Sequence, residues 1–165
     1  MKSADWPANT PFPLAGWTAE ALAQLPTYYV MDLGHGMAET VAPELPSAAA
    51  IAANRWLPEA ELAVYAEEYG RTGFQGGLNW YRCRTTGRFE SEYQLFAGRT
   101  IDVPAVFIAG AADWGIEQVP GALRRMRELA CTRMGPVRLV PGAGHWVQQE
   151  QPAAVAGLLL DWLRG

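Results

Sequence analysis

The sequence predicts an α/β fold in which parallel strands are joined by crossover helices. Two observations predict it: from residue 102 onward strand-like and helical segments alternate, and two short apolar runs have strand character. These runs are residues 103–110, rich in β-branched and aromatic side chains, and a segment that ends at Val140. A chain of 165 residues is long enough for one core with a small appended domain.

The first hundred residues are predicted to form turns and short helices. Residues 1–26 hold four prolines around a short helix at 18–25, which is typical of a segment running over a surface. Ser47 can cap an alanine-rich helix that ends at Arg55. A further helix begins near Leu57 and is predicted to stop at Gly70.

The carboxyl-terminal part is predicted to form one strand–helix–strand unit and a closing helix. Residues 118–130 are the candidate crossover helix, because their apolar side chains fall on one face. Pro152 favours a helix start, so residues 153–163 are predicted to form the last helix.

An acid and a histidine follow the two predicted strands. Asp113 comes just after the first strand, and His145 lies in a glycine-rich turn just after the second. Right-handed crossovers place the carboxyl ends of parallel strands at one edge of the sheet, where ligands of α/β proteins bind. A carboxylate that orients an imidazole base makes up two members of a nucleophilic triad.

Both residues also have simpler interpretations. Asp113 could cap the following helix, and His145 could make an ordinary loop hydrogen bond. The string Ala111-Ala112-Asp113-Trp114-Gly115 also fits the turn that carries an aspartate nucleophile. We reject that third interpretation, because only one strand–helix unit separates Asp113 from His145.

Composition excludes several classes of function. No apolar run is long enough to cross a bilayer and no signal peptide opens the chain, so we expect a cytoplasmic protein that does not bind membranes. The net charge of −4 without a basic cluster disfavours nucleic acid. Cys83 and Cys131 are expected to be free thiols, and no zinc site is expected.

Three segments resemble the α/β-hydrolase family and, within it, the soluble epoxide hydrolases. They are the strand and acid at 103–113, the Gly144-His145-Trp146 turn with Pro152 and its helix, and the string Arg71-Thr-Gly-Phe-Gln-Gly-Gly-Leu-Asn-Trp-Tyr81-Arg82. The resemblance covers roughly residues 27–165. It implies a connecting segment at 1–26, a helical lid at 27–99 and the carboxyl-terminal part of the hydrolase core at 100–165.

The resemblance also assigns roles to residues. It implies that Tyr81 donates a hydrogen bond to the epoxide oxygen, that His145 activates water, and that Asp113 orients His145. Counting back from Gly36-Met-Ala-Glu39 selects Tyr28 as a second lid tyrosine, with Tyr29 as the alternative. The implied reaction passes through a covalent alkyl ester and requires no metal or cofactor.

Four apolar side chains near these positions are candidates for lining the substrate pocket. They are Trp146, Trp114, Trp80 and Leu78, although core packing explains the tryptophans beside the acid and the histidine equally well. Such a pocket favours a small lipophilic epoxide, whose identity the sequence leaves open.

The nucleophile half of the family pattern is not recognisable before residue 100. Neither the His-Gly oxyanion motif nor the nucleophile turn is found there. We therefore expect the chain to correspond to the lid and the carboxyl-terminal part of an epoxide hydrolase, completed by an amino-terminal half or by homo-oligomerisation. The alternatives are a haloalkane or haloacid dehalogenase of the same fold, and a catalytically inert fragment or partner-binding module.

Overall fold

The computed structural model describes residues 10–165, so residues 1–9 of the expected connecting segment lie outside the described part. The chain divides into two compact units. Among the described residues, one unit holds 10–49 and 100–165, and the other holds 50–99. Residues 27–49 thus group with the strands rather than with residues 50–99, whereas the sequence placed them in the lid. The three-part division at 26 and 99 stays a prediction.

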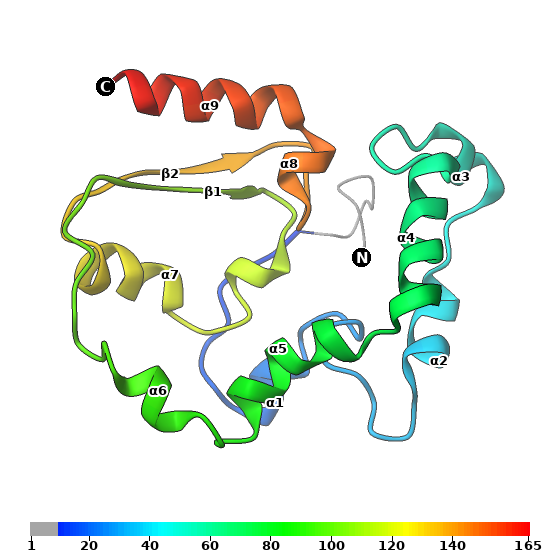
Figure 1. The fold of residues 1–165 in the computed structure, drawn as a ribbon, viewed down its shortest axis with the longest axis horizontal. Helices are drawn as coiled ribbons and strands as arrows, with labels where there is room; N and C mark the ends of the chain where they lie inside the picture. The colour runs from blue at the N-terminus through cyan, green and yellow to red at the C-terminus, as the bar shows by residue number, and fades with distance from the viewer. Residues whose placement is uncertain (1–9) are drawn as a thin grey trace. The chain divides into compact units, whose positions relative to one another are not determined.

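Helices and strands follow one another along the chain as labelled in Figure 1. In order they are α1 (Ala19–Leu22), α2 (Met37–Val41), η1 (Ala42–Glu44), α3 (Ala48–Ala53), α4 (Glu59–Thr72), α5 (Gln75–Thr85), α6 (Glu90–Gln94), β1 (Ala105–Gly110), η2 (Trp114–Ile116), α7 (Ala122–Arg125), η3 (Met126–Ala130), β2 (Met134–Val140), α8 (Val147–Glu150) and α9 (Pro152–Arg164).

The sheet consists of β1 and β2, which pair in parallel, as the sequence predicted. The register aligns Phe107 with Val137 and Gly110 with Val140, with one irregularity near Ala105. The two strands therefore end side by side. A parallel strand pair joined by a helical crossover is the basic unit of an α/β fold.

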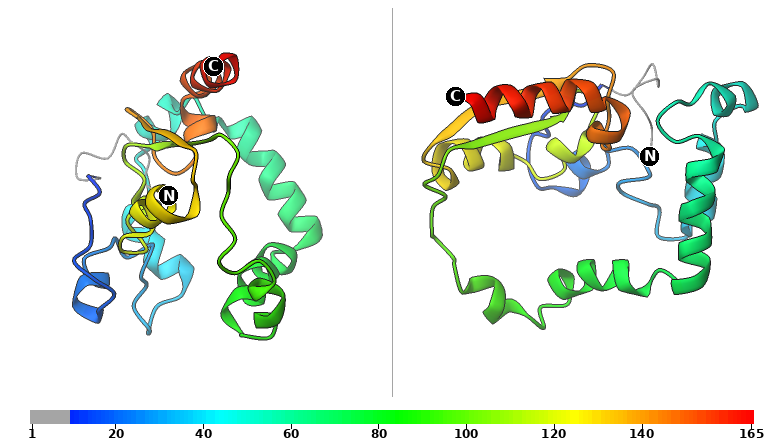
Figure 2. Two further views of the ribbon diagram at one scale, coloured as in Figure 1. Left: turned by 90° about the vertical axis from the view of Figure 1, so that its left-hand side faces the viewer. Right: turned by 45° about the horizontal axis from the view of Figure 1, so that its top comes forward.

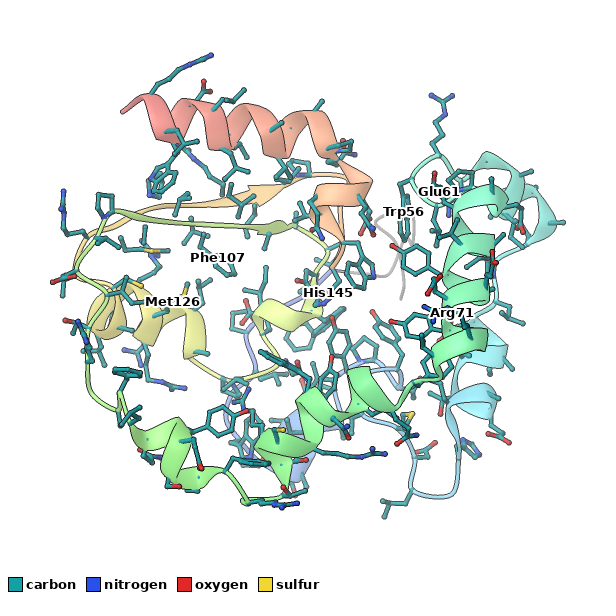
Figure 3. All side chains as sticks on the ribbon, in the orientation of Figure 1. Trp56, Glu61, Arg71, Phe107, Met126 and His145 are labelled. Carbon is teal, nitrogen blue, oxygen red and sulfur yellow. The ribbon has the colours of Figure 1, made fainter. Side chains whose placement is uncertain are left out.

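Helices lie on both sides of the strand pair. Figures 1 and 2 show α9 on one side and α7 on the other. A buried cluster of Val140, Ala143 and Val147, extended by Ile108 and by Val155 and Leu158 of α9, fills the α9 side. Phe107, the next residue to Ile108, lies on the side of β1 that faces α7 and Met126 (Figure 3).

Two predicted helix boundaries are wrong, for identifiable reasons. The crossover helix begins at Ala122 rather than at residue 118, because Gly121 adopts a left-handed conformation with φ of 72°. The long helix α4 continues through Gly70 and ends at Gly73, whose φ is 67°. A single interior glycine weakens a helix without breaking it, whereas a positive φ ends it.

No helix between residues 10 and 165 combines the length and apolar character that a bilayer crossing demands.

The turns that follow β1 and β2 approach each other closely at Gly110. A Cβ atom on Gly110 would lie 2.1 Å from the carbonyl oxygen of Gly144 and 2.4 Å from that of Ala143. Ala143 is completely buried, and its carbonyl accepts a hydrogen bond of 3.0 Å from the backbone N–H of Ala112. Any side chain at position 110 must therefore push the two turns apart.

We expect Gly110→Ala to lower the free energy of unfolding of the 165-residue chain by about 1–3 kcal/mol, because the added methyl group overpacks a backbone contact. Urea unfolding measures the change. The matched control is Gly157→Ala in α9, where an added Cβ meets nothing within 4 Å. There the same substitution should stabilise the chain by roughly 0.5–1 kcal/mol. Equal stability of the two variants would contradict the close approach.

Candidate active site

Asp113 lies in the turn after β1 and is 8% exposed. Its backbone N–H donates to the carbonyl of Gly110 (3.1 Å), and it is the N-cap residue of η2. Its Oδ1 accepts a hydrogen bond of 2.8 Å from the backbone N–H of Gly115. The capping role that the sequence suggested as the simpler interpretation is therefore present.

The same oxygen also meets the histidine. Nδ1 of His145 lies 3.1 Å from Oδ1 of Asp113, across 32 residues of sequence. A carboxylate oxygen can only accept, so Nδ1 of the neutral ring donates and Nε2 is left as an acceptor. The imidazole side chain is 45% exposed, and Figure 3 shows His145 near the carboxyl ends of the strands. The arrangement thus presents an oriented basic nitrogen outside the sheet.

A third donor reaches the same acid. The hydroxyl of Tyr29 donates to Oδ1 of Asp113 over 3.1 Å. The rings of Tyr28 and Tyr29 are 4.9 Å apart and tilted by 48°. The hydroxyl of Tyr29 therefore bonds Asp113, and the choice of Tyr28 over Tyr29 as the second lid tyrosine stays a prediction.

Both phenols are shifted toward their protonated form. Partial burial, followed by the negative charges of Asp113 and Glu44, raises the pKa of Tyr28 to about 12. Partial burial also raises the pKa of Tyr29, and the charge and hydrogen bond of Asp113 add to it. Each side chain is therefore a neutral hydroxyl donor at physiological pH.

Sequence reasoning missed Glu150, which fixes the turn that carries His145. Its Oε2 accepts from the backbone N–H of Gly144 (2.9 Å), and its Oε1 accepts from that of Trp146 (3.1 Å). A glutamate in the first turn of a short helix is a known partner for unpaired N–H groups at the helix start. That signal could have identified it, since Trp146 offers no capping oxygen.

The two tryptophans beside the site have different surroundings. Trp114 is buried in a cluster with Leu14 and Leu25, and its ring meets that of Phe12 edge-on at 5.0 Å. Its indole Nε1 has no hydrogen-bond partner among residues 10–165. Trp146 is 41% exposed, and its ring lies edge-on to that of His145 at 5.5 Å. Trp114 is therefore a core residue, whereas Trp146 is partly exposed and contacts the imidazole.

Three further candidates lie on α5, in the second unit. Tyr81 and Trp80 are largely exposed, and Leu78 is partly exposed. The expected convergence of Tyr81 with Asp113 and His145 stays a prediction. The same unit has an apolar hollow of about 440 Å³ lined by Leu62, Tyr65, Ala66, Tyr69, Gly70 and Phe74.

Cys83 and Cys131 are both free thiols. Over the described range, no group of three or more histidine, cysteine or acidic side chains is placed to hold a metal ion.

Comparison with known proteins identifies relatives of one kind. The chain is 42% identical over 126 residues to epoxide hydrolase A of Mycobacterium tuberculosis, which covers 73% of the chain and 35% of that protein. Potato epoxide hydrolase I superposes with a TM-score of 0.59 at 28% identity over 73% of the chain. An epoxide hydrolase from an endophytic Streptomyces gives a TM-score of 0.58 at 34% identity over 68% of the chain. No protein-family model matches.

The aligned segment is about a third of each relative, namely 35%, 37% and 33% of their lengths. The sequence and the structure comparisons both identify epoxide hydrolases, and the parallel strand pair described above is consistent with part of their α/β-hydrolase fold. The chain therefore belongs to the epoxide hydrolases of the α/β-hydrolase fold, and it spans about a third of the length of its relatives.

Proposed function

We propose that this chain supplies the base, the orienting acid and the proton donors of an enzyme that hydrolyses an epoxide to a vicinal diol. The observation that carries the proposal is the 3.1 Å contact between Nδ1 of His145 and Oδ1 of Asp113, at the carboxyl ends of a parallel strand pair. The relatives, which are named epoxide hydrolases, support the choice of substrate over the alkyl halide of a dehalogenase.

In the first step a carboxylate attacks an epoxide carbon and forms an alkyl ester with the enzyme. The carbon–oxygen bond of the ring breaks, and the developing alkoxide takes a proton from a tyrosine hydroxyl. Tyr81 is the proposed donor, and it lies on α5 within the proposed lid at residues 27–99. Tyr28, which the count back from Gly36-Met-Ala-Glu39 selects, is the proposed second donor, with Tyr29 as the alternative.

In the second step His145 activates water. Nε2 accepts a proton from the water molecule while the resulting hydroxide adds to the ester carbonyl, and collapse releases the diol and the carboxylate. Asp113 holds Nδ1 and stabilises the imidazolium that forms. The tyrosinate regains its proton from the imidazolium or from solvent. Trp146, beside the ring, is proposed to line the apolar side of a pocket for a small lipophilic epoxide.

The attacking carboxylate is proposed to come from polypeptide outside residues 1–165. Asp113 is committed to His145, and the parallel pair β1–β2 makes up the whole sheet among residues 10–165. Parallel sheets are normally larger and covered, and unpaired strand edges invite pairing with another segment. A complementing amino-terminal half, or a second copy, would supply the missing strands.

The isolated 165-residue chain is expected to form no diol from a styrene-type epoxide, because it lacks the attacking carboxylate. Chromatographic detection of the diol tests this. Turnover by the purified chain that disappears in His145→Gln would contradict the proposed source of the nucleophile.

In the enzyme completed by an amino-terminal half, His145→Gln should lower kcat by about 10²–10⁴-fold, because it removes the general base of the second step. The alkyl ester should then accumulate, and intact-protein mass spectrometry would detect it. The control is His35→Gln, which removes the other histidine of the chain and should leave turnover unchanged. Loss of both ester formation and turnover in His145→Gln would argue against a role of His145 in the second step alone.

The raised pKa of Tyr28 should make the free energy of unfolding depend on pH in the alkaline range. Because its pKa is raised from 10.0 to about 12, its contribution is fully present below pH 10 and is lost as pH rises toward 12. Tyr28→Phe should therefore flatten the fall of unfolding free energy over this range, as measured by urea unfolding at several pH values. Tyr93→Phe, an exposed tyrosine on α6, is the control and should keep the wild-type slope. Identical slopes in both variants would contradict the shifted pKa.

A further inference from the structure

The carboxylate of Glu150 bridges the backbone on both sides of His145. Oε2 accepts from the N–H of Gly144 (2.9 Å) and Oε1 from the N–H of Trp146 (3.1 Å). Glu150 is the last residue of α8 and is half-buried. The side chain of Glu150 thus bonds the residues directly before and after His145.

These two N–H groups have few other acceptors. Trp146 is the N-cap residue of α8, and its side chain makes no capping hydrogen bond. Gly144 is buried, where an unpaired N–H is costly. An ionised carboxylate with two oxygens can satisfy both groups at once with charge-assisted bonds.

Other contacts support the turn before and after His145: the carbonyl of Trp146 accepts from the backbone N–H groups of Gln149 and Glu150, both at 2.8 Å. Ala143 packs against Gly110, and the carbonyl of Gly142 accepts from the side-chain Nε2 of Gln151 at 3.0 Å. The imidazole itself is 45% exposed, so surrounding side chains do not enclose it. Among the described contacts, its position depends on the hydrogen bond to Asp113, on the edge-on contact with Trp146, and on the backbone of the turn that Glu150 helps to hold. A small displacement of a catalytic group costs much of its rate contribution.

We propose that Glu150 is a positioning residue, which holds the backbone of the His145 turn so that Nδ1 faces Asp113 and Nε2 faces the reacting ester. This inference rests on the proposed role of His145 as the base. Its structural part can be measured in the chain alone, without any activity.

The test is Glu150→Gln in the full 165-residue chain. The amide keeps one acceptor but turns an NH₂ group toward the other backbone N–H, so one of the two bonds is lost. Amide hydrogen exchange should accelerate on the order of tenfold or more at Gly144 or at Trp146, whichever N–H loses its acceptor, as expected for a lost charge-assisted bond. NMR relaxation should show greater motion of the His145 ring, while the His35 ring stays as in the wild type.

The matched control is Glu128→Gln, which removes an exposed carboxylate paired with Arg124 at 3.1 Å. It should change neither the exchange rates at Gly144 and Trp146 nor the motion of the His145 ring. If Glu150→Gln does not fold, the wild-type chain still gives an answer. Scalar couplings across the hydrogen bonds should connect the backbone nitrogens of both residues to the side-chain carboxyl carbon of Glu150, and their absence would overturn the proposal.

The outcomes separate this inference from the proposed function. Unchanged exchange and ring motion in Glu150→Gln would overturn the role of Glu150, whatever the activity. In the completed enzyme, the variant should lower kcat about tenfold and lower KM with it, so that kcat/KM changes little, because ester hydrolysis and not ester formation is affected. An unchanged kcat would also overturn the proposal. Failure of the completed wild-type enzyme to form diol would instead reject the proposed function. The exchange data would still report on the two hydrogen bonds that Glu150 accepts.

Discussion

The parallel pairing of β1 and β2 is the constraint on which the candidate site depends. It ends both strands at the same level, so that the turn with Asp113 and the turn with His145 meet. They come close enough for a hydrogen bond because position 110 has no side chain, since a Cβ there would lie 2.1 Å from a carbonyl oxygen of the opposite turn. A backbone contact between two loops thus determines the distance between an acid and a base.

Oδ1 of Asp113 is the point where three parts of the first unit converge. It accepts from the N–H of Gly115, from Nδ1 of His145 and from the hydroxyl of Tyr29. The cap fixes the carboxylate relative to β1, and the tyrosine ties the segment before α2 to the same atom. Structural capping and orientation of the base are therefore compatible roles for one buried acid, and neither excludes the other.

The sequence was sufficient for features that follow from strand direction. The contact between Asp113 and His145 could be predicted, because parallel strands with a helical crossover must end at one edge. The hydrogen bonds of Glu150 and Tyr29 could not be predicted in this way, because they depend on where the two side chains lie after folding. The end of α4 before Gly73 and the start of α7 at Ala122 depend on local φ values that a hydrophobic pattern does not encode. Tyr81 remains the residue whose role depends on the sequence string and not on geometry.

The tautomer of His145 is the most direct test of the account, because it depends on the contact with Asp113 and on nothing outside the chain. The ring nitrogens of His145 can be observed by ¹⁵N NMR in a His35→Gln background at mildly alkaline pH. We predict one dominant form with the proton on Nδ1, and loss of that preference in Asp113→Ala. A wild-type ring protonated mainly on Nε2 would contradict the oriented acid–base pair.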